Sequence, residues 1–386
     1  MGKYSWVSID RIVSSHMKRS DSFAPGPLYV AGFFTQSSGI AASAKLCATA
    51  LEALDYEVHR LDIGELRHEH LLTDVSPPIT EGGTCIIHVN PPELTYALKR
   101  LGISQHSQVK VIGYWAWELP KAPPQWISRS RLCHEVWVPS TFVATALQGA
   151  YCPVKTVPHP VPTVQTSASD QLSAFIPEKK FCCVCMFDMR SSLARKNPLG
   201  AIKAFKFAFP CNEDVSLIVK TQHGDKYPAS LAKLQAAAGS DQRIKLVDAV
   251  WDKTQVETLI RDCDVFLSLH RAEGFGLMIA EAMSMAKPVI ATAWSGNMDF
   301  LGEDYFGAIP AQLVPICDDD GIYEGQDWAA PDIAEAARRL RNLQNDPEKA
   351  RAVGADSRTR FNRALSLDAY GALVRERLAA DQPRNT

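Results

Sequence analysis

The chain has 386 residues, more than one hydrophobic core usually supports, so two domains are expected. Apolar residues make up 46% and charged residues 22%, a composition that excludes a largely disordered chain. With 41 Lys and Arg against 43 Asp and Glu, the formal net charge of -2 gives no attraction for DNA or RNA, so no nucleic-acid partner is expected.

The cysteines and the N-terminus indicate the compartment. The ten cysteines show no paired spacing and several lie in apolar runs such as 181–186, which is typical of buried thiols in a reducing compartment. No run of about 18 apolar residues exists, and Met1 to Trp6 lack the apolar core of a signal peptide. A cytoplasmic protein without disulfides or zinc is therefore expected.

Residues 1–20 mix basic and apolar side chains and predict a terminal helix, either on the protein's own surface or in contact with a membrane.

In the first half of the chain, short β-rich runs alternate with longer helical stretches. The expected strands are 28–34, 58–63, 84–89, 109–115, 135–139 and 155–157. This alternation is typical of parallel βαβ units with right-handed crossovers. We therefore expect residues 1–165 to form one doubly wound, Rossmann-like domain.

A Pro-, Ser- and Thr-rich segment interrupts the pattern and places a linker at 166–180. The pattern then resumes, with expected strands at 181–187, 215–220, 244–248, 265–270 and 289–292. A second Rossmann-like domain is expected over 181–360. Residues 361–386 are expected to form a C-terminal helix and tail, with packing against the first domain as one arrangement. The predicted fold class is α/β, with two doubly wound domains facing a cleft and ligands beyond the carboxyl ends of the strands.

The strongest motif runs from His270 to Met283, from a strand end through a glycine turn into a helix. It places Glu273 and Glu281 eight positions apart. If the helix begins near Gly276, its first amides and the positive end of its dipole favour an anionic diphosphate. Glu273 can then accept hydrogen bonds from sugar hydroxyls and Glu281 from a ribose diol. Spacing alone leaves open that Glu273 caps the helix and Glu281 lies on a solvated face.

This motif, with Gly-Phe-Gly between the glutamates and Ala-Lys-Pro-Val-Ile-Ala-Thr after them, resembles the donor-site signature of family-4 retaining glycosyltransferases of the GT-B fold. The resemblance extends to residues 188–198, where family members present an arginine and, six positions on, a lysine to the donor diphosphate. Arg190 and Lys196 have that spacing, and Arg195 is expected to be a solvated neighbour. The donor-binding residues that the motif implies are Gly274, Phe275, Gly276, Leu277 and Glu281.

Two segments of the first half extend the resemblance. Residues 32–41 are similar to the family's N-terminal glycine loop, with Gly39 facing the donor, although an ordinary strand-to-helix turn stays open. They lack the third glycine of the dinucleotide fingerprint, which disfavours an NAD-dependent dehydrogenase. Further on, Trp117 and Glu118 stand where many family members have a histidine followed by an acid. Glu118 is expected to order the acceptor or stabilise positive charge at the sugar, and Trp115 or Trp117 to stack on an acceptor ring unless core packing takes them.

Three further segments carry side chains that could bind a metal or face the cleft. Asp318-Asp319-Asp320 contains the Asp-x-Asp pattern of metal-dependent glycosyltransferases, but its position beyond the donor helix predicts a solvated acidic turn. His68-Glu69-His70 predicts a surface cluster, because the sequence reveals no partner ligands. His159 stands at the linker edge, where it could touch the cleft. No metal and no cofactor are expected, the nucleotide sugar being a co-substrate.

The resemblance covers about residues 28–360 and implies a retaining, metal-independent glycosyltransferase. It implies transfer of a mannose- or glucose-like hexose from a nucleotide-diphosphate donor to a glycan or lipid-linked glycan in surface-polysaccharide synthesis, in the cytoplasm or at the inner membrane face. The catalytic residues it implies are Glu273, Arg190, Lys196 and Glu118. Two alternatives stay open: an epimerase or hydrolase of the same fold, and a noncatalytic sugar-nucleotide-binding subunit, suggested by the missing histidine.

Overall fold

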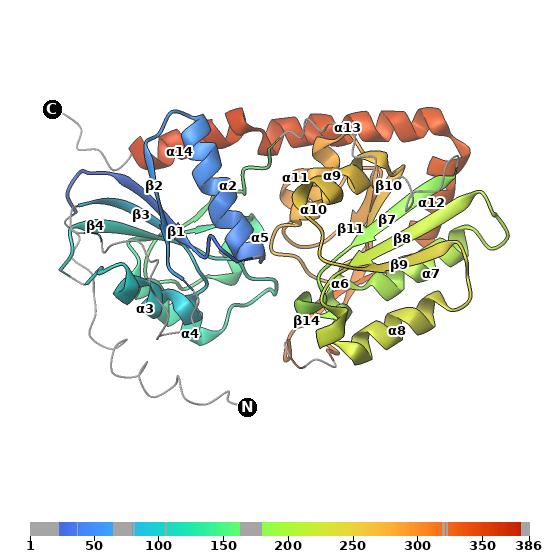
Figure 1. Ribbon diagram of the computed structural model, residues 1–386, viewed down its shortest axis with the longest axis horizontal. Coiled ribbons are helices and arrows are strands. Elements are labelled where there is room, and N and C mark those ends of the chain that lie inside the picture. The colour runs from blue at the N-terminus through green and yellow to red at the C-terminus, as the bar shows by residue number, and fades with distance from the viewer. Residues whose placement is uncertain are drawn as a thin grey trace. The chain divides into compact units, whose positions relative to one another are not determined.

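The structure is a computed structural model that describes residues 23–36, 38–64, 79, 82–104, 106–162, 180–318, 321 and 323–379 (Figure 1). The chain forms two compact units, one of residues 1–160 with 367–386 and one of residues 161–366. Each unit is built on its own parallel sheet, which confirms the predicted fold class. Of the expected linker only Lys180 is among the described residues, and the N-terminal residues 1–20 lie outside them.

Six parallel strands form the sheet of the first unit, in the order β2-β1-β3-β4-β5-β6. Their bounds are β1 Leu28–Gly32, β2 Val58–Asp62, β3 Gly83–His88, β4 Val109–Tyr114, β5 Glu135–Val138 and β6 Val154–Thr156. All six expected strands of this half are confirmed. The strand order reverses between β1 and β3, and ligands of doubly wound sheets bind beyond the strand ends at such a switch point.

The helices of the first unit cover its sheet and include the end of the chain. They are α2 Gly39–Ala53, α3 Pro91–Arg100, α4 Pro124–Arg129, α5 Thr141–Ala146 and α14 Leu367–Ala379. Gly32 lets α2 approach β1, because a Cβ there would lie 2.7 Å from that of Ala44. At the other end of the chain, α14 packs on α2, and Gly371 leaves room for the side chain of Leu54 (Figure 1).

The second unit has a sheet of the same kind, in the order β12-β11-β10-β7-β8-β9. The strands are β7 Phe181–Met186, β8 Val215–Thr221, β9 Ile244–Asp248, β10 Val265–Ser268, β11 Val289–Thr292 and β12 Ala308–Ile309. The five strands expected here are confirmed, and β12 is an addition. The strand order reverses between β7 and β10, so the loops after these two strands flank the switch point of this unit.

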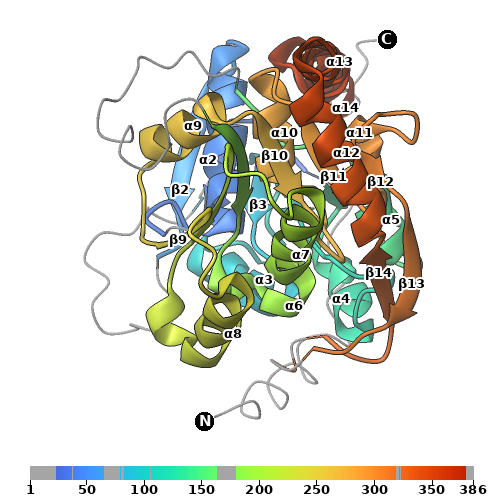
Figure 2. The same ribbon diagram turned by 90° about the vertical axis from the view of Figure 1, so that its right-hand side faces the viewer.

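Helices pack on both faces of the second sheet. They are α6 Leu193–Lys196, α7 Pro198–Ala208, α8 Pro228–Ala238, α9 Lys253–Asp262, α10 Leu277–Ser284, α11 Met298–Leu301, α12 Ile333–Asn345 and α13 Pro347–Leu365. In Figure 2, α7 and α12 lie side by side, whereas α13 packs against α10 and α11. Buried side chains from these helices and the sheet form one continuous core.

A two-stranded hairpin was not expected from the sequence. It consists of β13 Ala311–Pro315 and β14 Asp327–Pro331, paired antiparallel with Ala311 opposite Pro331 (Figure 2). Its first strand is largely solvent-exposed, with Leu313 56% exposed, so it shows neither the continuous apolar run of a buried strand nor a clean alternation.

All ten cysteines of the chain belong to the described residues, and none of them forms a disulfide. Seven are buried, including three in β7, which fits their expected role as apolar core residues. Within the described segments we find no helix whose length and apolar character would suffice to span a membrane.

Candidate functional site

The segment after β7 carries the expected cations. The carboxylate of Asp188 accepts a hydrogen bond from the amide of Arg190 at 2.9 Å and caps a short 3-10 turn. Ser192 then begins α6, and Asn197, with a φ of 50°, ends it. The Asn197 amide group donates to the carbonyl of Leu269 at 2.7 Å, so this segment is tied to the end of β10.

The segment after β10 turns into α10 at Gly276, as predicted. Gly276 has a φ of 95°, and a Cβ there would lie 3.1 Å from Ile279 and 3.3 Å from Asn297, so the turn requires glycine. The backbone of Glu273 is fixed on both sides: its amide donates to Ser295 Oγ at 3.0 Å, and its carbonyl accepts from the amide of Gly296 at 2.9 Å.

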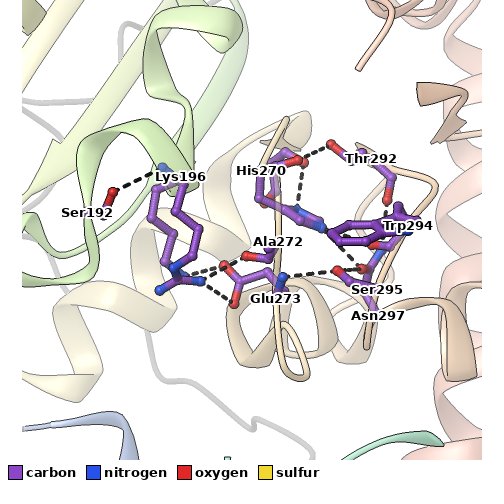
Figure 3. A network of polar contacts seen from close by, with 11 residues as sticks. Ser192, Lys196, His270, Ala272, Glu273, Thr292, Trp294, Ser295 and Asn297 are labelled. Atoms are coloured by element: carbon purple, nitrogen blue, oxygen red, sulfur yellow. Dashed lines mark hydrogen bonds and ion pairs between the residues drawn. The ribbon is translucent and has the colours of Figure 1, made fainter. Parts of the chain in front are cut away.

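His270 joins the carboxyl ends of β10 and β11 (Figure 3). Its Nε2 lies 3.1 Å from Asn297 Oδ1, and its carbonyl accepts from Thr292 Oγ1 at 2.6 Å. Burial lowers the pKa of the His270 imidazole, although the nearby Glu273 carboxylate opposes that effect. His270 is therefore a buried structural residue that supports the loop carrying Glu273.

Glu273 lies at the centre of a charge cluster between the two segments (Figure 3). Its carboxylate forms a hydrogen-bonded ion pair with Lys196 and lies 3.5 Å from Nη1 of Arg195. Burial opposes ionisation of Glu273, but the charges of Lys196 and Arg195 outweigh it and lower its pKa to about 2. The carboxylate is thus held ionised at the switch point of the second sheet.

The expectation that Arg195 is a solvated neighbour is wrong. Arg195 is only 3% exposed, its Nη1 donates to the carbonyl of Ala272 at 2.9 Å, and its guanidinium lies 5.7 Å from the ring centre of Tyr323. Neighbouring residues of a helix point about 100° apart, so α6 directs Arg195 inward while Lys196 keeps 23% of its side chain exposed. Arg195 contributes to the cluster as a buried counter-charge.

Arg190 forms its own ion pair with Asp188, at 2.7 Å, and keeps 37% of its side chain exposed. The hydrogen bonds that the Arg190 guanidinium donates to Asp188 raise the pKa of Arg190, and Gln222 also donates to Asp188 at 2.7 Å. Sequence reasoning missed Asp188, Gln222 and the buried Lys220, whose Nζ lies 5.4 Å from the ring centre of Trp251. Their position at or just after strand ends is the signal that could have found them.

Glu281 lies inside α10, partly buried and near Lys253 and Glu257 of α9. Burial raises the pKa of its carboxyl group to about 7, with Lys253 acting against the rise and Glu257 adding to it. The two glutamates of the motif therefore have oppositely shifted pKa values. The contact of Glu281 with a ribose diol stays a prediction.

In the first unit, two glycines of the expected loop play different parts. Gly32 is needed for the approach of α2 to β1, as described above. Gly39 begins α2 after a cap by Ser38, and a Cβ built on it would meet no described atom within 4 Å. Packing against the described residues thus does not explain the glycine at 39, and its donor-facing role stays a prediction.

The loop after β4 carries Glu118 and the two tryptophans. Asn90, just after β3, holds this loop by accepting a hydrogen bond from the amide of Ala116 at 3.1 Å. Trp115 is fully buried, so the expectation that it could stack on an acceptor ring is wrong for this residue. Trp117 donates to the carbonyl of Lys121 and is partly exposed, as is Glu118.

The remaining candidates have structural contacts. His159 is buried in the first unit, with Nδ1 3.1 Å from Tyr114 Oη, and burial lowers its pKa to about 4. Asp318 accepts from Ser192 Oγ at 2.9 Å, whereas Asp319, Asp320 and the segment His68–His70 lie outside the described residues. Within the described part of the chain, no three His, Cys, Asp or Glu side chains are grouped so that they could hold a metal ion.

Two doubly wound Rossmann-like units, each with polar loops beyond its strand ends, define the GT-B class of α/β fold. Comparisons with known proteins agree with this class. Residues 189–360 match the model of the family "Glycosyl transferases group 1". A D-inositol 3-phosphate glycosyltransferase of Kineococcus radiotolerans is 27% identical over 165 residues, a match that spans 40% of this chain and 35% of that relative.

Solved structures resemble the whole fold. HepE of Anabaena, in complex with UDP and glucose, superposes with a TM-score of 0.62 at 16% identity, over 92% of this chain and 99% of that one. TarM of S. aureus, as a variant with fondaparinux, α-GlcNAc-glycerol and UDP, gives 0.57 at 14% identity, over 78% and 55%. The similar structures show the same GT-B fold, and the family match lies in the second unit.

Proposed function

We propose that this chain is a retaining glycosyltransferase that moves a hexose from a nucleotide-diphosphate sugar to a glycan or lipid-linked glycan. The observation that carries the proposal is the contact of Lys196 and Arg195 with Glu273, close to the first turn of α10. Cations and helix amides suit a diphosphate, and an ionised carboxylate among them suits sugar hydroxyls.

In the proposed reaction, the leaving diphosphate gains negative charge as the bond to the sugar breaks. Lys196, Arg190 and the first amides of α10 stabilise that charge, which is the main catalytic device of the site. Glu273 orients the sugar, and Glu281 binds the ribose. The backbone from Gly274 to Leu277 closes around the donor. Because these groups already neutralise the diphosphate, no metal ion is needed.

The acceptor is proposed to meet the strand ends of the first unit. Glu118 follows β4 in a loop that Asn90 holds in place, and it orders the acceptor hydroxyl or stabilises positive charge at the sugar. The donor-facing role of Gly39 is part of the proposal, and it is consistent with the open space that a Cβ at Gly39 would meet. We place the reaction in the cytoplasm, at the inner membrane face where the acceptor is lipid-linked, as a step of surface-polysaccharide synthesis.

UDP-sugars are the first donors to test, because the complexes of HepE and TarM contain UDP. The chain is incubated with UDP-glucose, UDP-GlcNAc or GDP-mannose, with and without a glycan or lipid-linked glycan acceptor. Nucleoside diphosphate release and the anomeric configuration of the product are measured by NMR. Acceptor-dependent release with retained configuration supports the proposal. Donor consumption without an acceptor indicates an epimerase or hydrolase, and donor binding without turnover indicates a noncatalytic subunit.

Site variants connect the activity to the cluster. Arg190→Ala and Lys196→Ala should each lower kcat/KM at least about tenfold, since each removes a charge-assisted hydrogen bond from the developing diphosphate. Circular dichroism checks that both variants remain folded. Arg351→Ala, which removes a side chain that is 75% exposed on α13, is the control and should keep wild-type activity. Full activity in both site variants would place the diphosphate elsewhere.

A further inference from the structure

The hairpin of β13 and β14 is anchored to the loop that carries Glu273. The amide of Ala329 in β14 donates to the carbonyl of Arg271 at 2.9 Å. The guanidinium of Arg271 in turn lies 5.6 Å from the ring centre of Trp328, which is buried. The base of the hairpin is therefore fixed two residues from Glu273.

Two described residues between β13 and β14, Asp318 and Tyr323, contact the turn of α6. Asp318 accepts a hydrogen bond from Ser192 Oγ at 2.9 Å and another from the amide of Tyr323 at 3.2 Å. Tyr323 is buried, with its ring against the guanidinium of Arg195. The hairpin thus meets the residue that begins α6 and one of the cations that α6 carries.

Ser192 is a strained and fully buried position. Its φ of 63° is rare for a residue with a side chain, and such a conformation persists only where its surroundings enforce it. Its hydroxyl accepts from the amide of Arg195 at 3.2 Å and donates to Asp318. Asp318 therefore orients the hydroxyl that caps the single turn bearing Arg195 and Lys196.

We propose that Asp318 is a positioning residue of the donor site: through Ser192 it fixes α6 so that Lys196 meets the donor diphosphate. The inference rests on the proposed function and assigns the β13–β14 hairpin to the donor site. It gives Asp318 a role that differs from metal binding, since both of its carboxylate oxygens accept hydrogen bonds from the protein.

The direction in which Asp318→Ala changes the affinity for UDP distinguishes a positioning role from charge repulsion alone. Removal of an acid near an anion site strengthens anion binding if only Coulomb repulsion acts. Loss of a positioning residue weakens it. Asp318→Ala should therefore lower the affinity for UDP about tenfold, as measured by calorimetry, a size typical of directly coupled residues. Glu324→Ala removes an exposed acid from the same connecting segment and should leave the affinity unchanged or slightly raised.

A double-mutant cycle tests whether the effect passes through Lys196. Asp318→Ala combined with Lys196→Ala should bind UDP no more weakly than Lys196→Ala alone, because there is no longer an ammonium group to position. If Asp318→Ala weakened UDP binding only by disturbing the fold, its loss of affinity would add to that of Lys196→Ala. Ser192→Gly relieves the positive φ but removes the hydroxyl, and it should weaken UDP binding as Asp318→Ala does. Thermal melts confirm that each variant is folded.

The outcomes also separate this inference from the proposed function. A wild-type chain that binds none of UDP, GDP and ADP overturns both. A wild-type chain that binds UDP overturns the positioning role alone if Asp318→Ala binds as tightly or more tightly, or if its loss adds to that of Lys196→Ala. Loss of UDP binding on addition of a chelator, restored by magnesium in the wild type but not in Asp318→Ala, would instead make Asp318 a metal ligand.

Discussion

The raised pKa of Glu281 predicts that Glu281→Gln stabilises the protein at alkaline pH. The carboxyl group has a pKa of about 7 in the folded chain, against an ordinary value of 4.5. The folded chain therefore keeps a proton between these pH values that the unfolded chain has lost, and the free energy of unfolding falls as pH rises through this window. At full size the rise corresponds to about 3 kcal/mol. Only the part of the shift above pH 5.5, about 2 kcal/mol at full size, falls between pH 5.5 and 8.5. Because the residue is partly exposed, we expect about 1 to 2 kcal/mol over this range.

Denaturation by urea at pH 5.5 and 8.5 measures this difference. The glutamine variant does not titrate, whereas all other groups titrate in both proteins and cancel. The stability of Glu281→Gln relative to wild type should therefore increase by about 1 to 2 kcal/mol from the lower to the higher pH. Glu257→Gln is the matched control: it removes the charge that adds to the pKa of Glu281, so the midpoint of the pH dependence should move to lower pH. Parallel pH profiles of unfolding free energy for Glu281→Gln and wild type would contradict the raised pKa of Glu281.

The same titration affects the donor in the proposed function. An ionised carboxylate accepts hydrogen bonds from both ribose hydroxyls, whereas a protonated one loses part of that capacity. UDP affinity of the wild type should therefore fall as pH falls through about 7. Glu281→Gln should show weaker UDP binding without this pH dependence. UDP affinity that is flat from pH 6 to 8 in the wild type would remove Glu281 from the ribose contact.

Two further predictions concern the acceptor side and the metal. Glu118→Gln should lower kcat while the UDP dissociation constant stays unchanged, because Glu118 follows a strand of the first unit; wild-type turnover in steady-state assays would reduce Glu118 to a structural role. Transfer should persist in excess EDTA, because Lys196, Arg190 and the amides of α10 neutralise the diphosphate; complete loss of transfer that magnesium or manganese restores would contradict this.

The strands could be predicted because parallel strands covered on both faces are almost continuously apolar. β7, with the sequence FCCVCM, and β8, with all seven residues buried, are examples. The hairpin of β13 and β14 could not, since its position depends on contacts distant in sequence. The ring of Trp328 contacts the guanidinium of Arg271, and Asp318 accepts a hydrogen bond from Ser192, 126 positions away in the chain. No local periodicity encodes such pairs.

The sequence predicted candidate residues of the site but not the contacts that join them. The spacing of the motifs, read with the family resemblance, named Glu273, Arg190 and Lys196, and the glycine turn placed the start of α10 correctly. The pairing of Lys196 with Glu273 joins residues 77 positions apart. It also depends on the direction in which a single helical turn points its side chains, which is why Arg195 was misplaced.

The burial of Arg195 gives the proposed site a property that an exposed pair of cations would lack. A donor diphosphate that attracts Lys196 competes with Glu273 for the same ammonium group. A carboxylate that is 9% exposed and lost its only counter-charge would take up a proton, and a protonated Glu273 would orient a sugar less well. Arg195, held by Ala272 and Tyr323, lies 3.5 Å from that carboxylate, and we expect it to stay there when Lys196 moves to the diphosphate. In the proposed reaction we therefore expect the buried arginine to keep Glu273 ionised while Lys196 follows the charge that develops on the leaving group.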